Sequence, residues 1–108
     1  MTRLIVRLHK RAEAEIRETA AWYHVRGENL GVRFLGAVRT ALEQLESQTA
    51  RFSKLESIPG DLAIYRARVK DFPYLVIFEV FEKEVFVYAV AHASREPNYW
   101  RRRKRPKQ

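Results

Sequence analysis

The stretch YLVIFEVF at residues 74–81 is followed, after three charged residues at 82–84, by VFVYAVAH at residues 85–92. Both runs are apolar at nearly every position, which is typical of strands that are covered on both faces. The three residues between them are enough for a tight connection between antiparallel strands. The two runs therefore predict a β-hairpin, with residues 74–81 as a central strand of the sheet.

The residues before this hairpin alternate with a period of two, which is the period of a β-strand. From Leu62 onward, one face carries small and apolar side chains: Ala63, Tyr65, Ala67 and Val69. The opposite face is mostly basic: Ile64, Arg66, Arg68 and Lys70. Pro59-Gly60-Asp61 predicts a turn before this strand, and Asp71-Phe72-Pro73 ends it. Together with the hairpin, this strand predicts a three-stranded antiparallel meander.

The first part of the chain predicts a strand and then a helix. Residues 3–8 (RLIVRL) are few and include two β-branched side chains, so we expect a strand there. The period then changes to that of an amphipathic helix, with one apolar stripe formed by Ala12, Ile16, Ala20 and Tyr23. We expect Gly27 to end this helix, because glycine is common just after a helix C-terminus.

A second helix is expected from Asn29, which can cap its N-terminus, to about Gln48. Its apolar face comprises Phe34, Leu35, Val38, Leu42 and Leu45. The short connection between the two helices predicts an antiparallel helical hairpin. This face should be buried against the sheet, and burial of Leu42 is a direct check of the arrangement.

The order strand, helical hairpin, three-stranded meander predicts an α+β fold, with the hairpin packed on one face of the sheet. The other face would then be partly open. A functional site could lie on that open face.

The chain has 108 residues, which fits a single domain, and a net charge of +8. Six of the positive charges lie within residues 101–108, so residues 1–100 are close to neutral. We therefore expect one domain over residues 1–100 and a flexible basic tail over residues 101–108. Such a tail attracts polyanions, or it is only a solvated end that aids solubility.

Several classes of protein are excluded by composition. The sequence has no cysteine, which excludes disulfides, thiolate chemistry and cysteine-based metal sites. The N-terminal apolar run is too short for a signal peptide, and no stretch approaches the roughly 20 apolar residues that cross a bilayer. His9 and His24 are far apart in the sequence and predict no metal site. We expect a cytoplasmic protein that binds no cofactor, metal or membrane.

Two groups of residues could carry function. Arg66, Arg68 and Lys70 share one face of a strand, and neighbouring members of this row are about 7 Å apart. Such a row predicts an anionic partner, such as a phosphate or a glutamate-rich helix, unless the three side chains face only water.

The second group begins at His92, which ends the last strand on the face expected to hold Phe86, Tyr88 and Val90. Arg95 and Tyr99 follow it. A His, an Arg and a Tyr could act as base, cation and acid in RNA cleavage without a metal. A strand-end His is more commonly structural, and no strict motif is met.

The chain as a whole resembles the RelE/ParE superfamily of toxins of type II toxin-antitoxin systems, from about Leu4 to Arg103. The resemblance rests on the order and spacing of three motifs: Gly31 with Phe34-Leu35, Phe72-Pro73-Tyr74, and His92-x-x-Arg95-x-Pro97-x-Tyr99-Trp100. The second and third motifs are most similar to chains of the ParE-like, or plasmid stabilisation, type.

The resemblance implies a growth-inhibiting toxin that forms a hetero-oligomer with a cognate antitoxin, which neutralises it. ParE-like members inhibit DNA gyrase, and this is the favoured function. RelE-like members are ribosome-dependent mRNA endonucleases that need no metal, and a non-toxic member that only binds an antitoxin is a third alternative. If the chain is a nuclease, the resemblance implies Arg66, Arg68, His92, Arg95 and Tyr99 as catalytic residues, with Lys70 a weaker candidate. The lysine-rich stretch of RelE-like enzymes is reduced here to Lys54.

Overall fold

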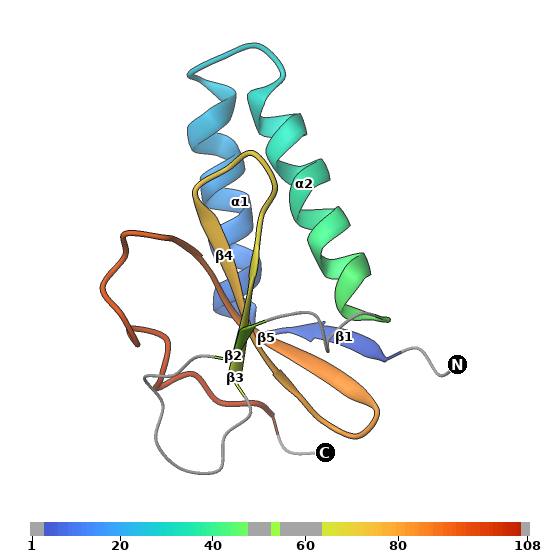
Figure 1. The fold of residues 1–108 in the computed structure, drawn as a ribbon. Helices are drawn as coiled ribbons and strands as arrows, with labels where there is room; N and C mark the ends of the chain where they lie inside the picture. Colours follow the sequence, from blue (N-terminus) through green and yellow to red (C-terminus); the bar gives the residue numbers. More distant parts are fainter. Residues whose placement is uncertain (1–3, 48–52, 55–63, 107–108) are drawn as a thin grey trace.

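A computed structural model describes residues 4–47, 53–54 and 64–106. The described elements are β1 (Ile5–Leu8), α1 (Lys10–His24), α2 (Leu30–Leu45), β2 (Ser53–Lys54), β3 (Ile64–Arg68), β4 (Tyr74–Val80) and β5 (Glu84–His92). Figure 1 shows the two helices as a hairpin beside the sheet. The predicted α+β fold, with its helical hairpin and its β3–β4–β5 meander, is confirmed. The predicted turn Pro59-Gly60-Asp61 and the predicted limits Arg3 and Gln48 lie outside the described residues.

The sheet has five strands in the order β1-β5-β4-β3-β2. The strands β3, β4 and β5 are antiparallel neighbours, as the sequence predicts. The pairing of β1 is new, because this strand lies parallel to β5, with Leu8 opposite Val87. The two-residue strand β2 pairs with β3 at the other edge. Because β1 takes one side of β5 and β4 the other, β5 is a central strand along its first half.

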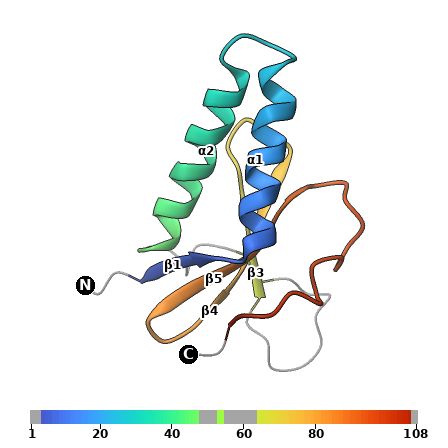
Figure 2. The ribbon, with the colours of Figure 1, turned by 180° about the vertical axis from the view of Figure 1, so that it is seen from behind.

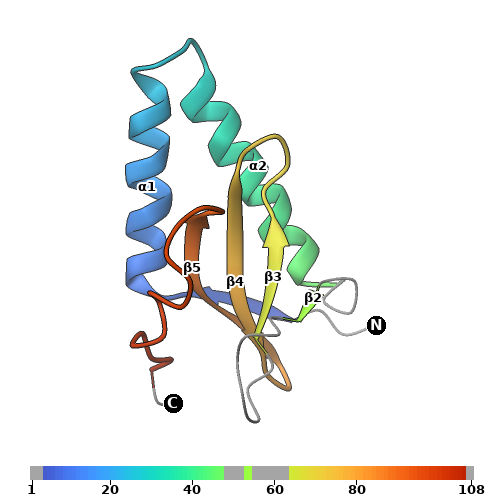
Figure 3. The ribbon, with the colours of Figure 1, turned by 60° about the vertical axis from the view of Figure 1, so that its left-hand side comes forward.

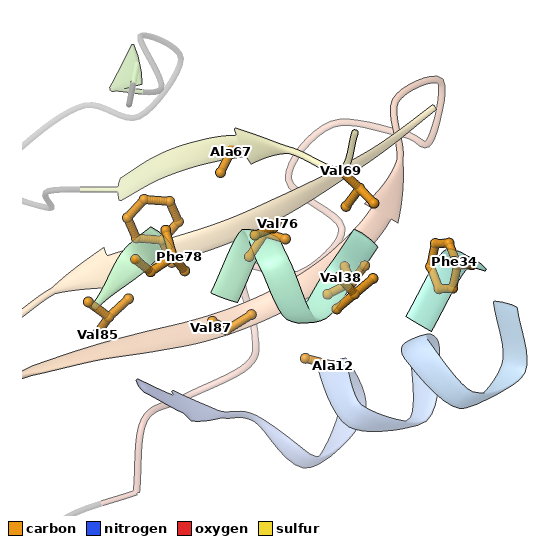
Figure 4. Packing of buried hydrophobic residues seen from close by; sticks show 12 residues of the cluster. Ala12, Phe34, Val38, Ala67, Val69, Val76, Phe78, Val85 and Val87 are labelled. Atoms are coloured by element: carbon orange, nitrogen blue, oxygen red, sulfur yellow. The ribbon is translucent and has the colours of Figure 1, made fainter. Parts of the chain in front are cut away.

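The main core fills the space between the helical hairpin and the sheet. Figure 2 shows the hairpin in front of the sheet, and Figure 4 shows Ala12, Phe34 and Val38 of the helices pointing toward side chains of the strands. Phe34 is fully buried and meets the rings of Tyr23, Phe72 and Tyr74 at centroid distances of 5.3–5.6 Å. The predicted stripe of α1 is confirmed, since Ala12 is buried and Ile16, Ala20 and Tyr23 pack against this cluster.

The buried face of α2 differs in part from the prediction. Its centre is formed by Gly31, Phe34, Val38, Ala41 and Leu45, at alternating spacings of three and four. Leu35 was expected on this face but is 45% exposed, and Leu42 is only partly buried. Each of these two leucines follows a central residue by one position, which rotates it about 100° around a 3.6-residue helix. Gly31 was not expected there. It allows close helix approach, because a Cβ would lie 2.8 Å from the Ala20 carbonyl oxygen.

Two expected helix caps are wrong in detail. The first helix ends at His24, with Val25 as its C-cap in right-handed helical conformation, so Gly27 does not form the cap. Asn29 does stand at the N-cap position of α2, but it has a φ of 61° and its side chain makes no cap hydrogen bond. Asparagine tolerates this left-handed conformation better than most residues, which explains its presence in a tight connection. At the start of α1, His9 acts as the cap, because its Nδ1 accepts a hydrogen bond from the Arg11 backbone N–H.

The face of the sheet opposite the helices is not left open along β5. Residues 99–106, which we name the C-terminal strap, turn back and run beside β5 toward the start of α1 (Figure 3). The indole of Trp100 is buried on this face among Ile64, Ile77, Phe86, Tyr88 and Ala89. Among the described residues, neither helix combines the length and the apolar character that crossing a membrane requires.

Candidate binding cleft at the end of β5

A cavity of about 300 Å³ lies between the end of β5, the neighbouring strands and the turn that leads into the strap. Four of the five predicted site residues line it: Arg66, His92, Arg95 and Tyr99. Its apolar lining comes from Leu75, Ile77, Ala91 and Trp100. We name this cavity the β5 cleft. Arg68 is exposed but does not line it, and Lys70 instead lines a shallow groove beside α2 with Arg33.

The chain reaches the cleft through a turn that its sequence favours. The Arg95 backbone N–H donates to the His92 carbonyl oxygen, which closes the turn after β5. Asn98 has a φ of 68°, a conformation that asparagine adopts more readily than most residues. This turn brings the guanidinium of Arg95 to 4.0 Å from the centre of the Tyr99 ring. Arg95 and Arg66 are both exposed, so the rim of the cleft carries two cations. Glu96 also lines the cleft.

The prediction that His92 shares one face of β5 with Phe86, Tyr88 and Val90 is wrong. A β-bulge between Ile77 and Phe78 of β4 adds one residue to β5 between Val87 and Ala89, and this shifts the alternation of the strand. Phe86 and Tyr88 therefore face the strap, whereas Val90 faces the helices. The ring of His92 packs edge-on against Tyr74, at a centroid distance of 5.2 Å.

The imidazole of His92 is held by its own turn. Its Nδ1 accepts a hydrogen bond from the Ser94 backbone N–H at 3.0 Å and lies 2.7 Å from the Ser94 Oγ. Because Nδ1 is an acceptor in this geometry, the neutral ring carries its proton on Nε2. In this tautomer Nε2 carries a proton and Nδ1 is bonded to Ser94, so neither nitrogen is placed to remove a proton.

The hydroxyl of Tyr99 is engaged by an acidic residue that sequence reasoning did not single out. It donates to Glu15 Oε2 at 2.5 Å. Burial, together with this hydrogen bond and the charge of Glu15, raises the pKa of Tyr99 above its ordinary range. Tyr99 thus fixes one wall of the cleft and keeps its proton in the bond to Glu15.

Glu15 is the centre of a polar cluster beside the cleft. Its carboxylate accepts hydrogen bonds from the Val90 backbone N–H, from Tyr99, and from both terminal nitrogens of Arg103 at 2.9 Å. Arg103 also donates to the Tyr88 carbonyl oxygen. The side chains of Glu15 and Arg103 are each only 11% exposed. Burial by itself would raise the pKa of Glu15, but the hydrogen bonds and the charge of Arg103 outweigh it, so this pKa is lowered.

The reason for this cluster lies in the sheet. The pairing of β1 with β5 ends at Val87, and no strand within the described part of the chain pairs with the next backbone groups of β5 on that side. Buried backbone N–H and C=O groups need partners. Glu15 and Arg103 supply them to Val90 and Tyr88. The only signal in the sequence is that Glu15 directly precedes Ile16 of the apolar stripe, which places it at the border of the buried face.

A second acidic residue holds the far end of the strap. Glu84 is 7% exposed, and its carboxylate accepts a hydrogen bond from Arg105 Nε at 2.7 Å and lies 3.6 Å from Arg7 Nε. The guanidinium of Arg105 also stacks 3.8 Å from the centre of the Phe81 ring. The sequence predicts a flexible tail over residues 101–108. Within residues 101–106, Arg103 and Arg105 have these specific partners on the folded body.

The site as a whole is a concave surface with an apolar floor and a cationic rim. Such a surface suits a partner that brings an anionic group beside an apolar one. Within residues 4–47, 53–54 and 64–106, no three His, Asp or Glu side chains gather into a group that could hold a metal ion.

Comparisons with known proteins point to one family. Residues 6–97 match the family described as "ParE toxin of type II toxin-antitoxin system, parDE". A solved structure described as "Chromosomal ParDE TA system from P. aeruginosa" superposes with a TM-score of 0.69 and 14% sequence identity, over 82% of this chain and 95% of that chain. At this identity the likeness concerns the fold alone. No curated protein sequence matches the chain significantly.

Proposed function

Because this chain belongs to the ParE toxin family of type II toxin-antitoxin systems, we propose that it inhibits growth by binding a protein target, DNA gyrase, and that a cognate antitoxin neutralises it. The observation that supports binding over catalysis is the state of the predicted catalytic groups. The hydroxyl of Tyr99 is held by Glu15, and the Nδ1 of His92 is occupied by Ser94. These side chains position the turn and the strap, and the two exposed arginines are left to meet a partner.

The β5 cleft suggests how the antitoxin and the target recognise the chain. Arg66 and Arg95 offer charge at the rim, and Leu75, Ile77 and Trp100 offer apolar surface below them. A partner segment with an acidic side chain next to an apolar one would satisfy both. Association should then slow as salt rises, because exposed charges are screened within about 10 Å at 0.1 M ionic strength.

A second candidate function is RNA cleavage. The observation in its favour is that Arg66, His92, Arg95 and Tyr99 do line one cavity. In an RNA-cleaving enzyme, loss of a group that stabilises the transition state costs about 10²–10³ in rate. In a binding site, truncation of one rim cation costs far less, because the central contacts carry most of the energy.

The test is to purify the chain and measure two activities side by side. One assay follows supercoiling by gyrase and the trapping of gyrase on cleaved DNA, and the other follows cleavage of mRNA on translating ribosomes. We expect inhibition of gyrase and intact mRNA. Cut mRNA with unaffected gyrase would establish the nuclease instead. A folded chain that affects neither and still binds its antitoxin would be a non-toxic family member.

Variants of the cleft sharpen this test. Arg66→Ala with Arg95→Ala should weaken gyrase inhibition severalfold and leave the melting temperature unchanged, because both side chains are exposed. The matched control is Arg33→Ala with Arg39→Ala on α2, which removes the same charge from another surface. An equal loss in the control would show that overall charge, and not the cleft, matters.

A further inference from the structure

One of the two exposed arginines at the rim of the β5 cleft is stacked on an aromatic ring. The guanidinium of Arg95 lies 4.0 Å from the centre of the Tyr99 ring, and no carboxylate of the described residues forms an ion pair with it. An exposed arginine without a fixed contact samples many rotamers, and a partner must then order it at a cost in entropy. The place of Arg95 at the rim therefore depends on the place of the Tyr99 ring.

The Tyr99 ring is in turn bound to Glu15 of α1. The Tyr99 hydroxyl donates to Glu15 Oε2, although the two residues are 84 positions apart in the sequence. The same carboxylate is bound by both terminal nitrogens of Arg103 and by the Val90 backbone N–H, so its own position is set from the strap and from β5. Donation to a carboxylate also polarises the phenol, which strengthens the attraction of its ring for a cation.

We propose that Glu15 is a positioning residue of the β5 cleft: through the Tyr99 ring, it holds the guanidinium of Arg95 where an anionic group of the partner meets it. This inference rests on the proposed function, in which a protein partner binds the cleft. Because Arg103 neutralises Glu15, the carboxylate orders Arg95 without cancelling the charge that the partner meets. The partner then finds a cation that is already ordered, which lowers the cost of binding.

The competing explanation is that packing alone holds the Tyr99 ring, which is partly buried against the cluster around Trp100. Tyr88 offers a matched comparison, because it belongs to the same cluster and its hydroxyl donates to another acid, Glu79, at 2.6 Å. Among the described residues, Tyr88 neither lines the cleft nor carries a stacked arginine. Loss of either hydroxyl removes one tyrosine–glutamate bond, but only the loss at Tyr99 should affect Arg95.

The first measurement follows the order of Arg95 in the full chain, without any target. NMR relaxation of the arginine Nε–H groups reports side-chain motion on the picosecond to nanosecond timescale. In the wild type, we expect Arg95 to be more ordered than Arg33, which is exposed on α2. Tyr99→Phe should lower the order of Arg95 to that of Arg33, whereas Tyr88→Phe should leave it unchanged. An Arg95 that stays ordered in Tyr99→Phe would overturn the proposal, because packing alone would then hold the ring.

Glu15→Gln tests the same contact from the other side. An amide oxygen accepts a weaker hydrogen bond than a carboxylate, so we expect a partial loss of order at Arg95. Adding Glu15→Gln to Tyr99→Phe should cause no further loss, with circular dichroism to verify that the variants are folded. A further loss in the double variant would show that Glu15 reaches Arg95 by a route other than the Tyr99 hydroxyl, which contradicts the proposal.

The second measurement is inhibition of gyrase, arranged as a double-mutant cycle. Tyr99→Phe and Arg95→Ala should each weaken inhibition severalfold, and the two together should weaken it no more than Arg95→Ala alone. Tyr88→Phe should leave inhibition unchanged. Additive losses from Tyr99→Phe and Arg95→Ala would also overturn the proposal, because Tyr99 would then act on the partner independently of Arg95.

The two measurements separate this inference from the proposed function. If the wild type does not inhibit gyrase and Arg95 loses its order in Tyr99→Phe, the proposed target is wrong and Glu15 still positions the rim cation. If the wild type and Tyr99→Phe inhibit gyrase equally, the target stands and the positioning role of Glu15 is refuted.

Discussion

The two faces of the sheet are covered by different kinds of interaction. On the helix side, aliphatic and aromatic side chains from α1, α2 and the strands form a continuous core around Phe34, Val76 and Phe78 (Figure 4). On the strap side, a smaller cluster around Trp100 is flanked by two ion pairs, Glu15 with Arg103 and Glu84 with Arg105. Burial of apolar area has no preferred direction, whereas these hydrogen-bonded ion pairs need a defined geometry.

Because of this difference, we expect the helix side of the sheet to determine stability and the strap side to determine recognition. The helix side can tolerate exchanges of similar volume, because its contacts are numerous and individually weak. The strap side depends on a few polar contacts, and one of them, from Glu15, also positions Tyr99 in the β5 cleft. Changes on the strap side should therefore alter binding surfaces while the helices stay folded.

The largest expected effect is on the helix side. Phe34→Ala should lower the free energy of unfolding by roughly 3–5 kcal/mol, because it removes a fully buried ring that contacts three other aromatic rings. Urea unfolding followed by circular dichroism measures this. The next residue, Leu35, is 45% exposed, so Leu35→Ala should cost less than about 1 kcal/mol. Equal effects of the two variants would mean that the buried face of α2 is misassigned.

The next effect is loss of the ion pair at the centre of the strap. Arg103→Met should cost about 3 kcal/mol, because it leaves the buried carboxylate of Glu15 without its charged partner. Adding Glu15→Leu should recover part of this loss, since replacing both members of a buried ion pair by apolar residues is often neutral. A double variant less stable than the single one would contradict this account.

The strap should also separate from the rest of the fold in this variant. The chain has two tryptophans, so Trp22→Phe leaves Trp100 as the only tryptophan reporter. In Arg103→Met, the fluorescence of Trp100 should change at lower urea than the helical circular dichroism signal. Coincident transitions would show that the strap and the helices unfold as one unit.

A smaller effect on stability is expected when the pH is lowered. The pKa of Glu15 in the folded chain is lowered from its ordinary value of 4.5. A group with a lowered folded pKa contributes stability above its unfolded pKa, and that contribution is lost as the pH falls through the folded value. The wild type should therefore lose more stability than Glu15→Gln as the pH falls below about 4.5. Parallel stability curves for the two proteins, measured by urea unfolding, would rule out this role for Glu15.

The smallest expected effect is at the far end of the strap. The side chain of Arg105 is 28% exposed, so its pair with Glu84 is partly screened by solvent. Arg105→Gln should change the melting temperature only slightly, because ion pairs that solvent screens contribute little to stability. A loss as large as that of Arg103→Met would show that both ends of the strap contribute equally.

Several features of this protein were determined by sequence alone. The two-residue period of residues 62–70 and the apolar runs of β4 and β5 predict the meander, and the stripe at Ala12, Ile16 and Ala20 predicts α1. These patterns are local, because the spacing of side chains along one element decides which of them can be buried. The spacing of the last motif also indicated that His92, Arg95 and Tyr99 belong together, and with Arg66 they line one cleft.

Only the tertiary structure decided what the basic end of the chain does. Residues 101–105 are all basic, so no apolar periodicity in the sequence marks Arg103 and Arg105 as the residues that face the folded body. Their positions follow from Glu15 and Glu84, which lie 88 and 21 residues away in the sequence. The bulge in β5 is equally invisible, because it depends on the register with β4. Long-range pairing of charges and strand register are set by the folded arrangement, and the cleft and the strap both depend on them.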